Sequence, residues 1–302
     1  MTEPTLPFRH AFGAMTTRCE LQFHGAAPGQ GEAVAAQVEA RVAQLVRRYN
    51  FHASDSWLNR AINERRGDSV PLDPECAEVL RIVREHAART RGAFDITVGT
   101  YAQHLRRART AQDVAAVRKR LGRFTGLDRW RLEGETLRFD NPATRFDLGG
   151  VIKEHAVDVC ARIARDAGIS AGLVNFGGDL FAFGRKPGNE RFVAAIPNPQ
   201  SPGQPMFGLD LEDQALTTSA HYARRREIKG GVLSHVVGAD PDRARWISAS
   251  VVSRSALVSG IYSTALLVEA DIELPADVLA VAVDRDNVIH RLAAAAEAPS
   301  PT

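Results

Sequence analysis

The clearest helical pattern in the chain runs from Ile152 to Ala167, where apolar residues recur at spacings of three and four. Its members are Ile152, Ala156, Val159, Ile163 and Ala167. This period is typical of an amphipathic helix with one buried face. Gly168 stands where a left-handed C-terminal cap belongs. The residues 172–175 and 180–183 that follow predict two short strands.

Similar patterns predict four more helices. One has an apolar stripe at Val34, Val38, Val42, Leu45 and Val46. A second begins after Asp73, a good N-cap, with Pro74 at the first helical position, and buries Val79, Leu80 and Val83. A third runs from Thr110 to Leu121, with Thr110 as its cap and Asp113 three residues later. The fourth covers 256–269.

Strand patterns alternate with these helices along the whole chain. We predict strands at 12–23, around 130–132, 137–139, 192–196 and 246–254, and strand pairs within 278–292; residues 197–205 form a proline-rich loop. No internal repeat or linker interrupts this series. We therefore predict one domain over 12–294, flanked by tails at 1–11 and 295–302.

Bulk composition changes this picture little. Of the 302 residues, 44% are hydrophobic and 25% charged, which is ordinary for a globular protein, and a net charge of +2 gives no bias toward nucleic acid. Cys19, Cys76 and Cys160 have no metal-like spacing, and the last two fall in helical patterns, where buried thiols are expected. Without an apolar leader, a lipid-attachment cysteine or a long apolar run, we expect a cytoplasmic protein without membrane insertion.

Two glycine pairs bracket the first helix described above. Gly149-Gly150 precedes it, and Gly177-Gly178 separates the two strands after it. Glycine lets backbone approach a ligand closely, and free N–H groups at a helix start suit an anion such as phosphate. Such pairs more often serve tight strand–helix packing, and from the residues alone we favour packing.

The surrounding sequence resembles one protein family. The run Asp147-Leu-Gly-Gly-Val-Ile-Lys153, followed by Ala156-Val-Asp158 and Val174-Asn-Phe-Gly-Gly-Asp179, resembles the central motif of the ApbE-type FAD:protein FMN transferases. Shorter matches extend from Met15 to Leu267. They include Gly92–Gly99, Ala215–Tyr222 and Ser234-His235.

This resemblance implies an α+β fold of the ApbE type (T-fold-like), with two layers of antiparallel sheet and flanking helices. It also implies a reaction. A threonine or serine hydroxyl of an acceptor redox protein attacks FAD, FMN becomes attached to that protein, and AMP leaves. His235 corresponds to the base that deprotonates the hydroxyl. The implied FAD-binding residues are Met15, Asp95, Gly149, Gly150, Lys153, Asn175, Gly177, Gly178, Asp179, Thr218 and Ser219.

The implied magnesium site departs from the family pattern. Its ligands would be the carbonyl of Ile152 and the hydroxyl of Thr264, but the family's aspartate is Gly260 here. Because magnesium prefers anionic oxygen, we expect a weakened site and a doubtful requirement for the metal. Glu154 stands where the family has glycine. It either replaces the lost carboxylate or is a surface glutamate favoured early in a helix, and we expect the second.

Two other functions stay open at this stage. The chain could bind flavin without transferring it, as a carrier that aids maturation of a redox protein. It could also hydrolyse FAD to AMP and FMN. Of the three functions, flavin transfer to an acceptor protein is the one that the sequence supports best.

Overall fold

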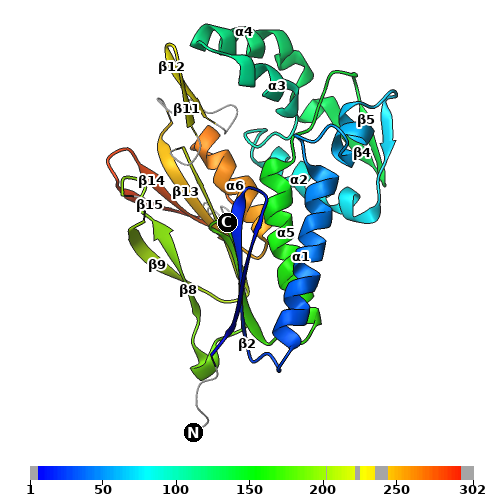
Figure 1. Cartoon of the computed structure of the whole chain (residues 1–302). Helices are drawn as coiled ribbons and strands as arrows, with labels where there is room; N and C mark the ends of the chain where they lie inside the picture. Colours follow the sequence, from blue (N-terminus) through cyan, green and yellow to red (C-terminus); the bar gives the residue numbers. More distant parts are fainter. Residues whose placement is uncertain (1–5, 202, 222–224, 235–243, 294–302) are drawn as a thin grey trace, which may run out of the picture.

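An antiparallel sheet of eight strands forms the centre of the computed structural model, which describes residues 6–201, 203–221, 225–234 and 244–293 (Figure 1). The strands lie in the order β1-β2-β6-β7-β10-β13-β14-β15. Their bounds are β1 Phe8–Ala14, β2 Thr17–His24, β6 Ala171–Phe176, β7 Asp179–Phe183, β10 Gln214–Ala220, β13 Trp246–Ser253, β14 Leu279–Asp284 and β15 Ile289–Leu292.

Three helices pack on one face of this sheet. They are α1 (Gln30–Tyr49), α5 (Gly149–Asp166) and α6 (Ala256–Val268), and α5 lies between the other two (Figure 1). Their apolar residues form the main core with the inward side chains of β2, β6 and β13. The other face of the sheet carries the hairpin of β8 (Phe192–Pro197) and β9 (Pro205–Leu211), with a smaller core beneath it.

The remaining elements gather beside and beyond the helices. They are the π-helical turn η1 (Leu58–Asn63), α2 (Pro74–Arg89), α3 (Gly99–Arg107), α4 (Ala111–Leu121), the sheet of β3 (Ser69–Pro71), β4 (Trp130–Glu133) and β5 (Thr136–Phe139), and the hairpin of β11 (Arg225–Ile228) and β12 (Gly231–Ser234). Short 3-10 turns lie at Gly122–Phe124, Leu127–Arg129 and Pro187–Asn189. Over the described ranges, no helix is long and apolar enough to cross a membrane.

The predicted α+β class, with antiparallel sheets and flanking helices, is confirmed, but the second sheet layer is only a two-stranded hairpin. The predicted strand at 12–23 is a hairpin instead, because Met15 and Thr16 turn the chain with φ of 50° and 61°. The first strand thus begins at Phe8, within the segment predicted as a tail. All three cysteines are buried and free, as expected for the two in helices.

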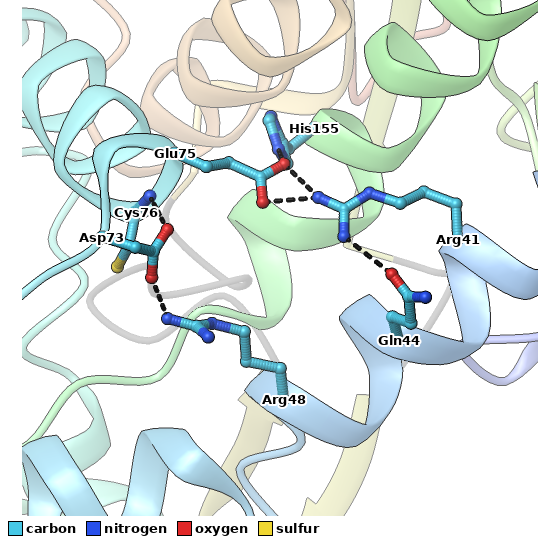
Figure 2. A network of polar contacts seen from close by, with 7 residues as sticks. All are labelled: Arg41, Gln44, Arg48, Asp73, Glu75, Cys76 and His155. Carbon is cyan, nitrogen blue, oxygen red and sulfur yellow. Dashed lines mark hydrogen bonds and ion pairs between the residues drawn. The ribbon is translucent and has the colours of Figure 1, made fainter.

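A polar network joins α1, α2 and α5 (Figure 2). Arg41 of α1 donates to both carboxylate oxygens of Glu75 in α2, and His155 Nε2 of α5 lies 3.0 Å from Glu75 Oε1. Two turns further along α1, Arg48 pairs with Asp73, which caps α2 through the amide of Cys76. Burial alone would raise the pKa of Glu75, but the hydrogen bonds with Arg41 and His155 hold that pKa below its usual value.

This network predicts an acid-sensitive contribution to stability. The pKa of Glu75 is lower in the folded than in the unfolded chain, so its contribution is present at neutral pH and is lost as pH falls below about 4 and through the folded pKa. We expect Glu75→Gln to lower the free energy of unfolding by about 1 kcal/mol at neutral pH, a small value because the side chain is 34% exposed. Urea unfolding near pH 7 and near pH 3 measures the difference.

A neighbouring glutamate provides the control. Glu78 of α2 pairs with Arg81, and both side chains are more than half exposed. Glu78→Gln should therefore change stability little at either pH. A loss for Glu75→Gln that is equal at neutral and acid pH would contradict the assignment of the effect to the charged carboxylate.

Candidate functional site

Among the residues that the structure describes, one backbone amide in the first turn of α5 has no hydrogen-bond acceptor. The Gly149 amide donates to Asp147 Oδ1 at 2.9 Å, and the amides of Val151 and Ile152 donate to the carbonyl of Leu148. The amide of Gly150 has no acceptor among the described residues, and both glycines are exposed. Gly150 itself has non-helical φ and ψ of −94° and 18°, so its N–H lies at the positive end of the regular helix that follows, where it can bind an anion.

Both glycine amides of the turn between β6 and β7 donate hydrogen bonds to other groups of the protein. The Gly177 amide donates to the carbonyl of Arg18 at 3.1 Å, and the Gly178 amide donates to Asn175 Oδ1 at 2.8 Å. Gly177 has φ of 65°, and a Cβ there would collide with Thr17 of β2. Gly178 has φ of 100°, and a Cβ there would meet no atom within 4 Å. This turn therefore offers open space at Gly178 rather than hydrogen-bond donors.

A buried ion pair connects this turn to α5. Lys153 Nζ pairs with Asp179 at the start of β7 and lies 3.3 Å from Glu154 Oε1. Asp179 is 2% exposed and Glu154 is 5% exposed. The predicted FAD-binding residues Lys153 and Asp179 thus lie together, and the lysine charge is shared between two buried carboxylates.

Glu154 is not the surface residue that the sequence predicted. Its side chain lies against Gly260 of α6, where an added Cβ would be 2.7 Å from Glu154 Cγ. The physical reason is that α5 is covered on two sides, because α6 packs on the face that carries Glu154. Asp158, one turn further, faces α6 as well: it accepts hydrogen bonds from the amides of Ala256 and Leu257 and from Ser255 Oγ.

Hydroxyl groups line the same region of α6. Ser219 Oγ of β10 lies 2.9 Å from Ser263 Oγ and 3.2 Å from Thr264 Oγ1. Thr264 follows Gly260 by one turn and therefore shares its face of the helix. Ile152, the other predicted metal ligand, is a buried residue in the first turns of α5.

Thr218 does not belong to this cluster of hydroxyl side chains. Its Oγ1 lies 2.8 Å from Ser250 Oγ of β13, the residue directly opposite it in the sheet. Successive residues of a strand point to opposite faces. With Ser219 directed at α6, Thr218 is directed away from it, and the structure separates these two predicted FAD-binding residues.

Asp95 and Met15 lie near the glycine turns. The neighbour of Asp95, Phe94, is the closest side chain to Gly150, and Asp95 accepts hydrogen bonds from the amide and hydroxyl of Thr97. Asp95 also lines a cleft of about 240 Å³. Burial raises the pKa of Asp95, although these hydrogen bonds oppose the rise. Met15 forms the turn before Thr17, which contacts Gly177.

His235, the predicted base, lies outside the described residues. Two residues of the site had no predicted role, Asp158 and Ser263. A signal for both was present: Glu154 and Asp158 are four apart in one helix, and serines recur every four residues from the N-cap of α6 onward, at 255, 259 and 263.

The arrangement combines features suited to a phosphate ester: a free amide at a helix start, an ammonium group, open space over a glycine turn and clustered hydroxyl and carboxylate oxygens. Comparisons with known proteins point to one family. The model of the ApbE family matches residues 15–281. The FAD:protein FMN transferase of Rhodobacter capsulatus is 28% identical over 284 residues, and the match covers 91% of this chain but only 54% of that protein.

Other relatives and structures are similar over comparable lengths. The FAD:protein FMN transferase of Klebsiella pneumoniae is 26% identical, with 81% of this chain and 73% of that protein covered. The ApbE protein of Thermotoga maritima has a structure that superposes with a TM-score of 0.83 at 21% identity, covering 94% and 96% of the two chains. The flavinyl transferase ApbE of Pseudomonas stutzeri gives 0.77 at 23% identity, covering 96% of each chain.

Proposed function

Because the chain belongs to the ApbE family, we propose that it transfers the FMN part of FAD to a threonine or serine hydroxyl of an acceptor protein. The observation that carries the proposal is the junction of α5 with the β6–β7 turn. There a free amide at Gly150, the open face of Gly178 and the Lys153–Asp179 pair come together. These groups suit a pyrophosphate better than they suit an uncharged ligand.

In this reaction the acceptor oxygen bonds to the phosphorus on the FMN side, and the bond from that phosphorus to the bridging oxygen breaks. AMP leaves with the bridging oxygen, and the hydroxyl proton passes to a base. The Gly150 amide holds a phosphate oxygen at the helix start, and Lys153 places positive charge beside it. Asp179 and Glu154 orient that ammonium from buried positions.

The oxygens at the α5–α6 contact fit a divalent cation. Glu154 has one buried carboxylate oxygen, Oε2, with no hydrogen-bond partner among the described residues, and the Thr264 hydroxyl lies on the face of α6 that Glu154 contacts. Oxygen donors of this kind are those that Mg²⁺ prefers. When bound, the ion would offset negative charge on the pyrophosphate.

Mass spectrometry of an acceptor tests the proposed function. The protein is incubated with FAD, MgCl₂ and a redox protein that carries a flavinylation motif, and the intact mass of that acceptor is measured. Addition of FMN with release of AMP supports the transferase. Free FMN and AMP without a labelled acceptor would identify an FAD hydrolase instead, and unchanged bound FAD would identify a carrier.

His235 is our proposed base for the acceptor hydroxyl. We expect His235→Ala to reduce the rate of FMN transfer by about 10²–10⁴-fold while FAD affinity stays unchanged, because only the proton transfer is lost. Single-turnover labelling measures the rate, and quenching of FAD fluorescence measures binding. The control is His104→Ala, an exposed histidine of α3. Equal losses of binding and rate in His235→Ala would show a structural role.

A further inference from the structure

The buried charges at the start of α5 do not balance. Two carboxylates, Glu154 and Asp179, are each at least 95% buried, and within the described ranges Lys153 is the one cation paired with either. Glu154 Oε2 has no hydrogen-bond partner among those residues. Buried charged oxygens normally have partners, because removing them from water without one is costly. The excess negative charge and the unpartnered oxygen together favour the binding of a cation here.

Glu154 fills the position of a side chain that α6 lacks. A Cβ added to Gly260 would lie 2.7 Å from Glu154 Cγ, 3.3 Å from Cδ and 3.5 Å from Cβ. The buried glycine is thus required by the glutamate, and the carboxylate reaches the face of α6 from the neighbouring helix. An aspartate at 260 has no room while Glu154 is present, so adding it alone cannot restore a site.

The neighbouring donors define the kind of ion. Thr264 Oγ1 lies one turn beyond Gly260, and Ser219 Oγ is 3.2 Å from it. No three His, Cys, Asp or Glu side chains come together as a metal cluster anywhere in the described residues. One carboxylate with neutral hydroxyls is a poor site for zinc. It suits Mg²⁺ or Mn²⁺, which keep several waters and bind through one or two carboxylates plus phosphate oxygens.

We propose that Glu154 of α5 is the anionic ligand of a divalent cation held against α6, with the Thr264 hydroxyl beside it. Glu154 and Gly260 are an exchanged pair: the carboxylate has moved from one helix to the other, and glycine has taken its place. The role of the ion in FMN transfer rests on the proposed function. Binding of the ion does not, because it is measured without FAD or acceptor.

Titration with Mn²⁺, followed by the loss of its free electron paramagnetic resonance signal, tests the proposal on the full chain. We expect Glu154→Gln, which keeps the shape and removes the charge, to weaken Mn²⁺ binding at least tenfold. Asp166→Asn, an exposed acid at the end of the same helix, serves as the control and should leave binding unchanged. Equal Mn²⁺ affinity in the parent protein and Glu154→Gln would overturn the proposal.

The exchanged pair allows a second test that does not depend on one variant. Gly260→Asp alone should lower the melting temperature without improving Mn²⁺ affinity, because the two side chains collide. The double variant Glu154→Gly/Gly260→Asp should keep Mn²⁺ affinity within a few-fold of the parent protein. Stronger Mn²⁺ binding by Gly260→Asp alone, or none by the double variant, would overturn the exchange.

The two proposals fail in different ways. Glu154-dependent Mn²⁺ binding by a protein that labels no acceptor would reject the transferase and keep the cation site. FMN transfer by a protein whose Mn²⁺ binding does not depend on Glu154 would keep the transferase and reject the site.

Discussion

Gly178→Val is expected to abolish FAD binding in a protein that still folds. The Gly178 backbone has φ of 100°, which side chains rarely adopt, and the space over its Cα is open. A valine there adds backbone strain of about 1–3 kcal/mol and projects into the space that we assign to the pyrophosphate. Quenching of FAD fluorescence measures the loss of affinity, and thermal unfolding measures the strain.

A matched control separates these two effects. Gly203, in the loop between β8 and β9, has φ of 98° and is equally open around its Cβ. Gly203→Val should therefore carry a comparable strain and bind FAD normally. If both valines weaken FAD binding equally, or if Gly178→Val binds FAD as well as the parent protein, the pyrophosphate does not lie over this turn.

Lys153→Met is expected to have the largest effect on stability, about 3–5 kcal/mol. The methionine fills similar space, but Asp179 and Glu154 then lose the ammonium that pairs with both of them in their buried positions. Removing one partner of a buried ion pair leaves an uncompensated buried charge. The free energy of unfolding then falls far more than it does when an exposed ion pair is removed. Guanidinium unfolding at neutral pH measures the change.

Two further variants define the origin of this loss. Lys119→Met changes an exposed lysine of α4 and should cost little. Lys153→Met/Asp179→Asn removes both partners and should recover part of the stability lost in the single variant, since Asp179 no longer carries a buried charge. A double variant that is less stable than Lys153→Met would show that the lysine acts by packing and not by its charge.

Local signals in the sequence were sufficient for five helices, whereas α3 was not predicted. Asp73 with Pro74, and Thr110 with Asp113, predict helix starts that the structure confirms, because capping involves only residues within one turn. The hairpin at Met15 and Thr16 could not be predicted in the same way. Both residues take positive φ without glycine or asparagine, so its turn lacks the usual sequence signal.

The site was harder to predict, because it depends on which helix faces lie together. Periodicity in α5 identifies the face toward the sheet, but Glu154 and Asp158 lie on a second buried face that only the packing of α6 creates. For Thr218 and Ser219, strand alternation alone indicates that both cannot face α6. The family motif includes both residues and so conceals this difference.

The hydrogen bonds from α6 to Asp158 also determine when the site can form. Asp158 and the amide of Ala256 are 98 residues apart in the sequence, so their contact forms only after α6 has been synthesised. Glu154 and Gly260 meet across the same two helices, so they come together in this late step as well. A nascent chain that lacks α6 would have its glycine turns and its lysine, but not its assembled site. Folding order would thereby keep an incomplete protein from binding the cation.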